Sequence, residues 1–151
     1  MWTQIRQFCC GFLMFIGLVS SGLAKEPPIY TPTFSNVAVS GYDAVAYFTQ
    51  QKPVKGDPKF STEYMGAKWQ FSTAENRDKF VKNPEQFAPQ YGGYCAWAVA
   101  QGWTASGDPT LWKIVNDKLY LNYDKDKQQK WEADIPGNIK KANANWPKVL
   151  N

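Results

Sequence analysis

Few side chains in this sequence could perform acid–base, nucleophilic or metal-binding chemistry. Histidine is absent from all 151 residues, which excludes Ser–His and Cys–His nucleophile pairs and any imidazole metal site. The sequence shows no evident pair of carboxylates and no phosphate-binding glycine loop. General acid–base catalysis would therefore rest on isolated Asp, Glu or Tyr side chains, so an enzyme ranks last among the functions we consider.

Cysteine and methionine are the soft metal ligands of proteins, and beyond residue 24 the chain has one of each. Cys95 follows Gly92-Gly93 near the start of a predicted helix, where partial positive charge lowers the pKa of a thiol. The same position also suits a small buried hydrophobe. Cys95 and Met65 could hold copper(I) together if the fold brought the two sulfur atoms into contact.

A second group of candidates surrounds an acidic residue that follows a Gly-Tyr pair. The carboxylate of Asp43 could contact a ligand or a hard metal ion, or it could cap a short helix without any ligand. Nearby aromatic side chains could line a small-molecule cleft and orient the guest, and core packing is their alternative use. The predicted ligand-binding residues are Tyr42, Asp43, Tyr47, Tyr94 and Trp97.

The first 24 residues have the three-part pattern of a cleavable signal peptide. Arg6 precedes an apolar run at 8–19, and small residues lead to Ala24. The run is shorter than the roughly 20 residues that a membrane-spanning helix needs, and Cys9 and Cys10 lie inside it, a context unsuited to lipid attachment. We therefore expect cleavage after Ala24, export to the periplasm or the medium, and no stable membrane anchor afterwards.

The composition of the remaining chain favours one compact domain. About 127 residues remain after cleavage, enough for one hydrophobic core. They include one cysteine, so no intramolecular disulfide forms, and the many aromatic side chains must supply stability by packing. The formal net charge of +4 falls by one with Arg6 and is spread without a basic cluster, so we expect no nucleic acid partner.

Hydrophobic patterning predicts an α+β fold. Residues 25–36 are rich in proline and form an extended leader, and residues 37–151 form a small single domain without internal repeats. Alternating residues predict two β-hairpins, at 59–71 and at 111–123. Four to five short helices complete the fold, one of which starts at a capping box made by Ser72 and Glu75.

Five segments, in order, resemble the YHS family in its exported bacterial branch. The segments are SGYDAVAYF at 40–48, EYxGAxWxF at 63–71, NRDxF at 76–80 followed by Asn83-Pro84, YGGYCA at 91–96 and KLYLNY at 118–123. The resemblance implies a heavy-metal role with copper as the candidate metal, since the family occurs fused to copper-transporting ATPases and to some hydroxylases.

The resemblance also implies a two-cysteine metal site, at the end of the second hairpin strand and at the start of the next helix. Those two positions are Ser72 and Asn76 here, and neither supplies a thiolate. Three functions remain open. The first is an exported non-enzymatic binding protein for a copper-like metal ion or a small ligand, the second a structural or partner-docking module of the cell envelope, and the third an enzyme of unknown chemistry.

Overall fold

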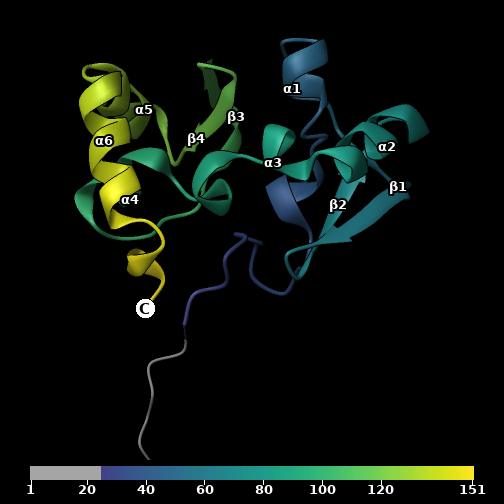
Figure 1. The fold of residues 1–151 in the computed structure, drawn as a ribbon, viewed down its shortest axis with the longest axis horizontal. Helices are drawn as coiled ribbons and strands as arrows, with labels where there is room; N and C mark the ends of the chain where they lie inside the picture. The colour runs from purple at the N-terminus through teal and green to yellow at the C-terminus, as the bar shows by residue number, and fades with distance from the viewer. Residues whose placement is uncertain (1–24) are drawn as a thin grey trace, which may run out of the picture.

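The computed structural model describes residues 25–151, and the predicted signal peptide lies outside them. The α+β class and both hairpins are confirmed: within residues 25–151, two two-stranded antiparallel sheets combine with six α-helices rather than four or five. Within residues 25–151 no helix is long and apolar enough to span a membrane. The chain forms two halves that lie side by side, with α3 (Pro84–Phe87) between them (Figure 1).

Each half contains the same six elements in the same order. The first half consists of η1 (Ala38–Gly41), α1 (Ala46–Thr49), β1 (Asp57–Tyr64), β2 (Ala67–Phe71), α2 (Ala74–Lys82) and α3. The second consists of η2 (Gln90–Gly93), α4 (Ala96–Gln101), β3 (Asp108–Val115), β4 (Lys118–Asn122), α5 (Lys125–Glu132) and α6 (Ile135–Asn145), followed by η3 (Lys148–Leu150). The chain therefore contains an internal repeat, and the expectation that it has none is wrong.

The two hairpins correspond residue by residue at a spacing of 51 residues. Each opens on Gly-Asp-Pro, at 56–58 and at 107–109, and each has a bulge after its Asp and then four consecutive strand pairs. Phe80 of α2 and Trp131 of α5, also 51 residues apart, are both fully buried. The repeat therefore extends from the hairpin into the helix that packs on it.

Different burial of the two halves hides this repeat in the sequence. In β2, alternate residues are buried, as in a strand with one solvated face. In β4, residues 119–122 are all buried, because α4, α5 and η2 also pack on this strand. The same backbone position therefore carries Gln70 in one half and Leu121 in the other, and few identities remain.

The two halves share their hydrophobic packing. Leu119 and Leu121 of β4 belong to the core that surrounds Trp69 and Phe71 of the first half. The second core, around Trp131, fills the space between β4 and helices α4 to α6. Because the second hairpin contributes to both cores, the halves form one domain.

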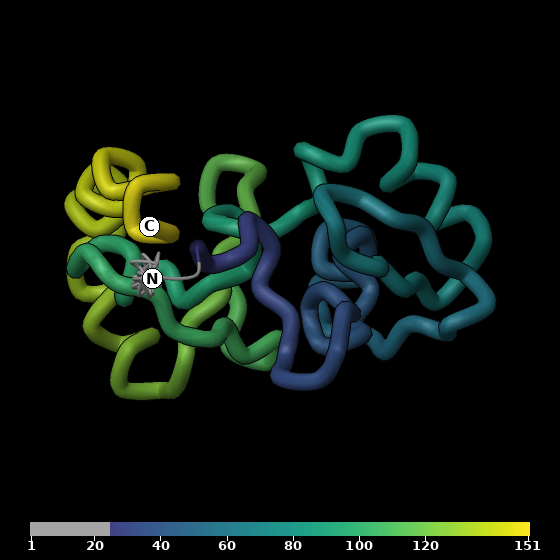
Figure 2. The backbone as a smooth tube through the Cα atoms, turned by 90° about the horizontal axis from the view of Figure 1, so that it is seen from below, coloured from purple at the N-terminus to yellow at the C-terminus, as the bar shows by residue number. Residues whose placement is uncertain are grey.

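Residues 25–36 are extended and contact the second half. The Glu26 amide donates to the Leu150 carbonyl at 2.8 Å, and the Tyr30 amide donates to the Gly92 carbonyl at 2.9 Å. Gly92 has a φ of +62°, and a Cβ there would collide with the Pro28 carbonyl, so this crossing requires glycine. The segment then passes between the two halves (Figure 2).

Candidate functional site

Asp43 is fully buried at the junction of α1 with the first hairpin. Its Oδ1 accepts the amides of Val45 at 2.9 Å and Ala46 at 3.2 Å. Its Oδ2 accepts the amide and the hydroxyl of Ser72, at 2.8 and 2.7 Å, and Nδ2 of Asn76 at 2.8 Å. Five donors therefore occupy this carboxylate, and two of them are amides of the turn that leads into α1, whose N-cap residue is Val45.

The capping residue of α2 differs from the predicted one. Oγ1 of Thr73 accepts the Asn76 amide at 3.1 Å, whereas the Ser72 hydroxyl donates to Asp43. The predicted capping box from Ser72 to Glu75 is therefore wrong by one residue. The Ser72 hydroxyl is oriented toward the buried carboxylate of Asp43, and α2 begins after Thr73, which takes the capping position.

The two positions that the family resemblance assigns to metal-binding cysteines do not fit a metal ion. Ser72 and Asn76 carry no thiolate, and both direct their donor hydrogens at Asp43. Across residues 25–151 no group of three or more Cys, Asp or Glu side chains is placed to hold a metal ion. We therefore derive no metal chemistry at this position.

Cys95 is fully buried where α4 begins. Its thiol donates to Oδ1 of Asn122 at a sulfur–oxygen distance of 3.6 Å. Burial raises the pKa of the Cys95 thiol, and amides of Ala98, Tyr123 and Trp97 that point at the sulfur only partly oppose this. The expectation of a lowered pKa is therefore wrong, because desolvation of the thiolate outweighs the amide dipoles.

The predicted pair of sulfur ligands has no shared site. Met65 lies in the turn between β1 and β2 and is 51% exposed. Cys95, in contrast, bridges to Leu121 of β4 in the interior of the second half. Copper(I) would need both sulfur atoms in one coordination sphere, and this fold places one in solvent and the other in the core.

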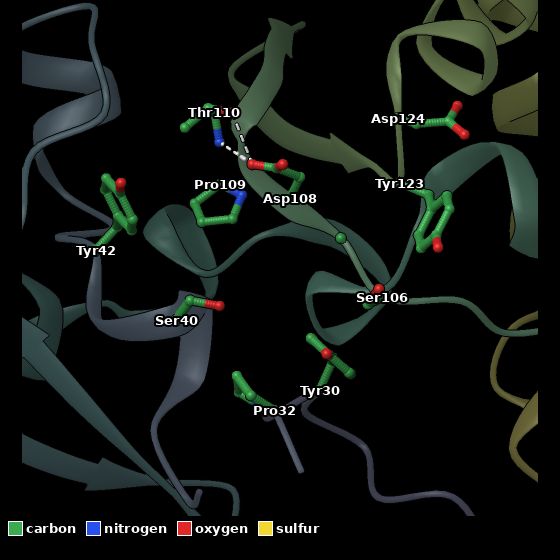
Figure 3. A pocket seen from close by; sticks show the side chains of 11 residues that line it. Tyr30, Pro32, Ser40, Tyr42, Ser106, Asp108, Pro109, Thr110, Tyr123 and Asp124 are labelled. Carbon is green, nitrogen blue, oxygen red and sulfur yellow. Dashed lines mark hydrogen bonds between the residues drawn. The ribbon is translucent and has the colours of Figure 1, made fainter.

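A cleft of about 790 Å³ opens where the two halves and the leader meet (Figure 3). Three separate segments of the chain form its walls. The lining residues are Tyr30 and Pro32 of the leader, Ser40 and Tyr42 of the first half, and Ser106, Gly107, Asp108, Pro109, Thr110, Tyr123 and Asp124 of the second half. The cleft thus depends on how the halves are assembled.

Two carboxylates of the cleft are held by short local hydrogen bonds. Oδ1 of Asp108 accepts the amide and the hydroxyl of Thr110 at 2.8 and 2.7 Å. Oδ1 of Asp124 accepts the Lys127 amide at 2.7 Å as the N-cap of α5. These bonds fix the orientation of each carboxylate and leave its Oδ2 free for another partner. Oδ2 of Asp124 lies 3.7 Å from the Lys127 ammonium.

Tyr47 supports the cleft from beneath. It is fully buried, its hydroxyl donates to the Pro109 carbonyl at 2.7 Å, and its ring meets Trp112 edge-on with centroids 5.3 Å apart. Burial raises the pKa of Tyr47 far above its usual value, and the neighbouring Tyr42 and Asp108 raise it further. Tyr47 therefore positions the cleft wall and remains protonated.

The predicted ligand-binding residues do not gather in one pocket. Of these five, Tyr42 lines the cleft, Tyr47 lies beneath it and Asp43 is sealed in its hydrogen-bonded cage. Tyr94 is buried, and its hydroxyl donates to the Pro27 carbonyl at 2.9 Å. Trp97 packs against Trp103, away from the cleft lining.

Most of the cleft was not predicted from the sequence. The local sequence around Asp108 is typical of a turn and that around Asp124 is typical of a helix cap, and neither pattern indicates a cleft. The recurrence of Gly-Asp-Pro at 56–58 and at 107–109 is the signal that could have drawn attention to Asp108. Tyr30 and Tyr123 carry no local signal, because they reach the cleft through tertiary packing.

Comparison with known families matches residues 45–91 to the YHS domain. The match begins just before α1 and ends inside η2, so it covers most of the first half. Neither the curated proteins nor the solved structures include one similar to this chain.

Proposed function

We propose that this chain, which carries a YHS domain over residues 45–91, is an exported, non-enzymatic binding protein that holds a small molecule between its halves. The observation that carries this proposal is the cleft of about 790 Å³, a size typical of small-molecule sites. Aromatic rings and a few convergent polar groups line it, which is the usual composition of such sites.

The walls of the cleft are supported from behind. The hydrogen bond from Tyr47 to Pro109 joins the first half to the start of β3. The cage around Asp43 holds the turn that carries Tyr42. A preformed cleft of this kind loses little conformational entropy on binding, which supports binding as its role.

The reactive groups of the described chain favour binding over catalysis. The carboxylate of Asp43 is occupied by five donors. Burial raises the pKa of Cys95 and of Tyr47, so the thiolate and phenolate that would act as nucleophile or base are disfavoured. The signal-like sequence at residues 1–24 supports export.

The first experiment is a small-molecule screen on the full chain expressed in an exporting host. Native mass spectrometry identifies any retained ligand, and ligand-observed NMR measures binding of library compounds. Tyr123→Ala should weaken binding of a hit about tenfold. Trp103→Ala is the matched control, because Trp103 and Tyr123 are both 52% exposed but only Tyr123 lines the cleft.

We expect hits whose affinity depends on Tyr123 and not on Trp103. Two results would overturn the proposal: a library and a native spectrum without any bound small molecule, or hits that bind equally well to both variants and to Tyr42→Ala.

A further inference from the structure

We infer that the ligand of this cleft is a small organic cation, held by the tyrosine rings of the lining and by Asp108. The inference rests on the proposed binding function and specifies the chemistry of the ligand. Charge, aromatic faces and the position of Lys55 each support it.

The lining of the cleft has negative charge and no positive charge. Asp108 and Asp124 contribute carboxylates, and no Lys or Arg belongs to the lining. Asp124 pairs with Lys127 behind the lining at 3.7 Å, so in the part of the chain that the structure describes Asp108 carries the unpaired charge. Within residues 25–151, Oδ2 of Asp108 accepts no hydrogen bond, since Thr110 donates only to Oδ1. This oxygen can therefore accept from an ammonium group or lie beside a quaternary nitrogen.

Aromatic faces complete a cation site. Tyr30, Tyr42 and Tyr123 line the same cleft, and Figure 3 shows Tyr42 and Tyr123 on opposite walls. The negative face of an aromatic ring attracts a cation within about 6 Å of its centroid. Carboxylates together with tyrosine rings select a cation that has apolar substituents.

Lys55 shows that the ring of Tyr42 attracts an ammonium group. Its Nζ lies 4.2 Å from the centroid of the Tyr42 ring and donates to the Ser40 carbonyl at 3.3 Å. Among the described residues Lys55 forms no ion pair with a carboxylate. Lys55 itself lies outside the cleft lining, so its contact shows what the Tyr42 ring attracts and leaves the cleft open to a ligand cation.

The size of the site favours an organic cation over a metal ion. A metal ion needs several oxygen ligands at 2.0–2.6 Å, and the described residues provide no group of three acidic side chains. The cleft of about 790 Å³ is far larger than a dehydrated ion. An alkylammonium compound can contact a ring and a carboxylate at the same time.

The test compares a panel of organic cations with neutral molecules of the same shape by calorimetry on the full exported chain. Diamines and quaternary ammonium compounds form the panel, and choline with its neutral isostere 3,3-dimethylbutan-1-ol is the reference pair. We expect at least one cation to bind about tenfold more tightly than its neutral counterpart.

Three variants locate the effect. Asp108→Asn should weaken binding of the cation about tenfold, and Tyr42→Ala should weaken it about threefold because one ring face is lost. Asp57→Asn is the matched control. Asp57 also follows Gly and precedes Pro, and its Oδ1 also accepts the amide two residues on, but it lies outside the cleft lining.

The outcomes separate the two proposals. Neutral or anionic hits that depend on Tyr123, with no cation of the panel bound, would overturn the cation inference and leave the binding function intact. Cation binding that Asp108→Asn and Asp57→Asn weaken equally would also overturn it. A cleft that binds no small molecule of any charge would overturn both.

Discussion

Asp43 in the first half and Cys95 in the second occupy the same place in the repeat. Each follows a Gly-Tyr pair, is followed by an alanine and lies close to the start of a helix, α1 or α4. The Asp43 amide donates to the Val54 carbonyl and the Cys95 amide to the Ala105 carbonyl, both at 2.8 Å. One half therefore buries a carboxylate where the other buries a thiol.

The backbone around these two side chains is also the same. Three amides point at each side chain: those of Val45, Ala46 and Ser72 at Asp43, and those of Trp97, Ala98 and Tyr123 at Cys95. Because main-chain donors come from the fold, they are present whichever residue occupies the centre. The side chain decides whether the cage holds a charge or a weak sulfur acceptor.

This comparison explains why the family match does not locate the cleft between the halves. The match at 45–91 identifies one half of the repeat, whereas the cleft is formed by both halves and the leader. The second hairpin has the same register as the first, but its Asp108 and Asp124 line a surface that exists only where the halves meet. The proposed binding function therefore depends on the assembly of two similar units.

Removal of the central side chain, Asp43 in one half and Cys95 in the other, should give the largest difference in stability between the two halves. Asp43→Ala leaves five buried donors without an acceptor, and we expect it to lower the free energy of unfolding by about 4 kcal/mol. Cys95→Ala removes a small buried sulfur group and should cost about 1–2 kcal/mol. Urea unfolding followed by fluorescence measures both.

Asp43→Asn serves as the intermediate, since it keeps one acceptor oxygen but places an amide against the donors of Ser72 and Asn76. Its stability should fall between those of the wild type and Asp43→Ala. Equal losses of unfolding free energy for Asp43→Ala and Cys95→Ala would show that the hydrogen bonds to Asp43 stabilise the fold no more than the packing of Cys95 does.

Alkaline pH should destabilise the second half more than the first. Burial raises the pKa of Tyr91, Tyr94, Tyr120 and Cys95 in the second half, and of Tyr47 in the first. The unfolded chain releases these protons at lower pH than the folded chain does. Stability is therefore complete below pH 9 and falls as the pH rises.

Tyr94 defines the window best, because burial and the neighbouring Glu26 raise its pKa to about 12. Its contribution should be lost between pH 10 and about 12. Urea unfolding at pH 8, 10 and 11 measures the fall, and Tyr94→Phe should show a shallower one. As the pH rises, amide protection measured by hydrogen exchange should be lost first in the second half. An equal loss in both halves, or no loss, would contradict this assignment.

The sequence predicted what depends on neighbouring residues. Both hairpins follow from local alternation. The Asp124 cap and the left-handed Gly102 at the end of α4 agree with ordinary capping preferences. The internal repeat was missed because burial differs between equivalent strands, so Gln70 and Leu121 stand at one position. The cleft was missed because its walls come from segments far apart in the chain.

The smallest expected effects concern the two helix caps, and they test whether equivalent positions can have different functions. Thr73 caps α2 and Asp124 caps α5, and each accepts the amide three residues on. Thr73→Ala and Asp124→Ala should each cost about 1 kcal/mol in urea unfolding. Only Asp124 lines the cleft, so only Asp124→Ala should also weaken ligand binding. Asp124→Asn, which keeps the cap but removes the charge, should retain stability and still lose affinity, whereas unchanged affinity would assign Asp124 to capping alone.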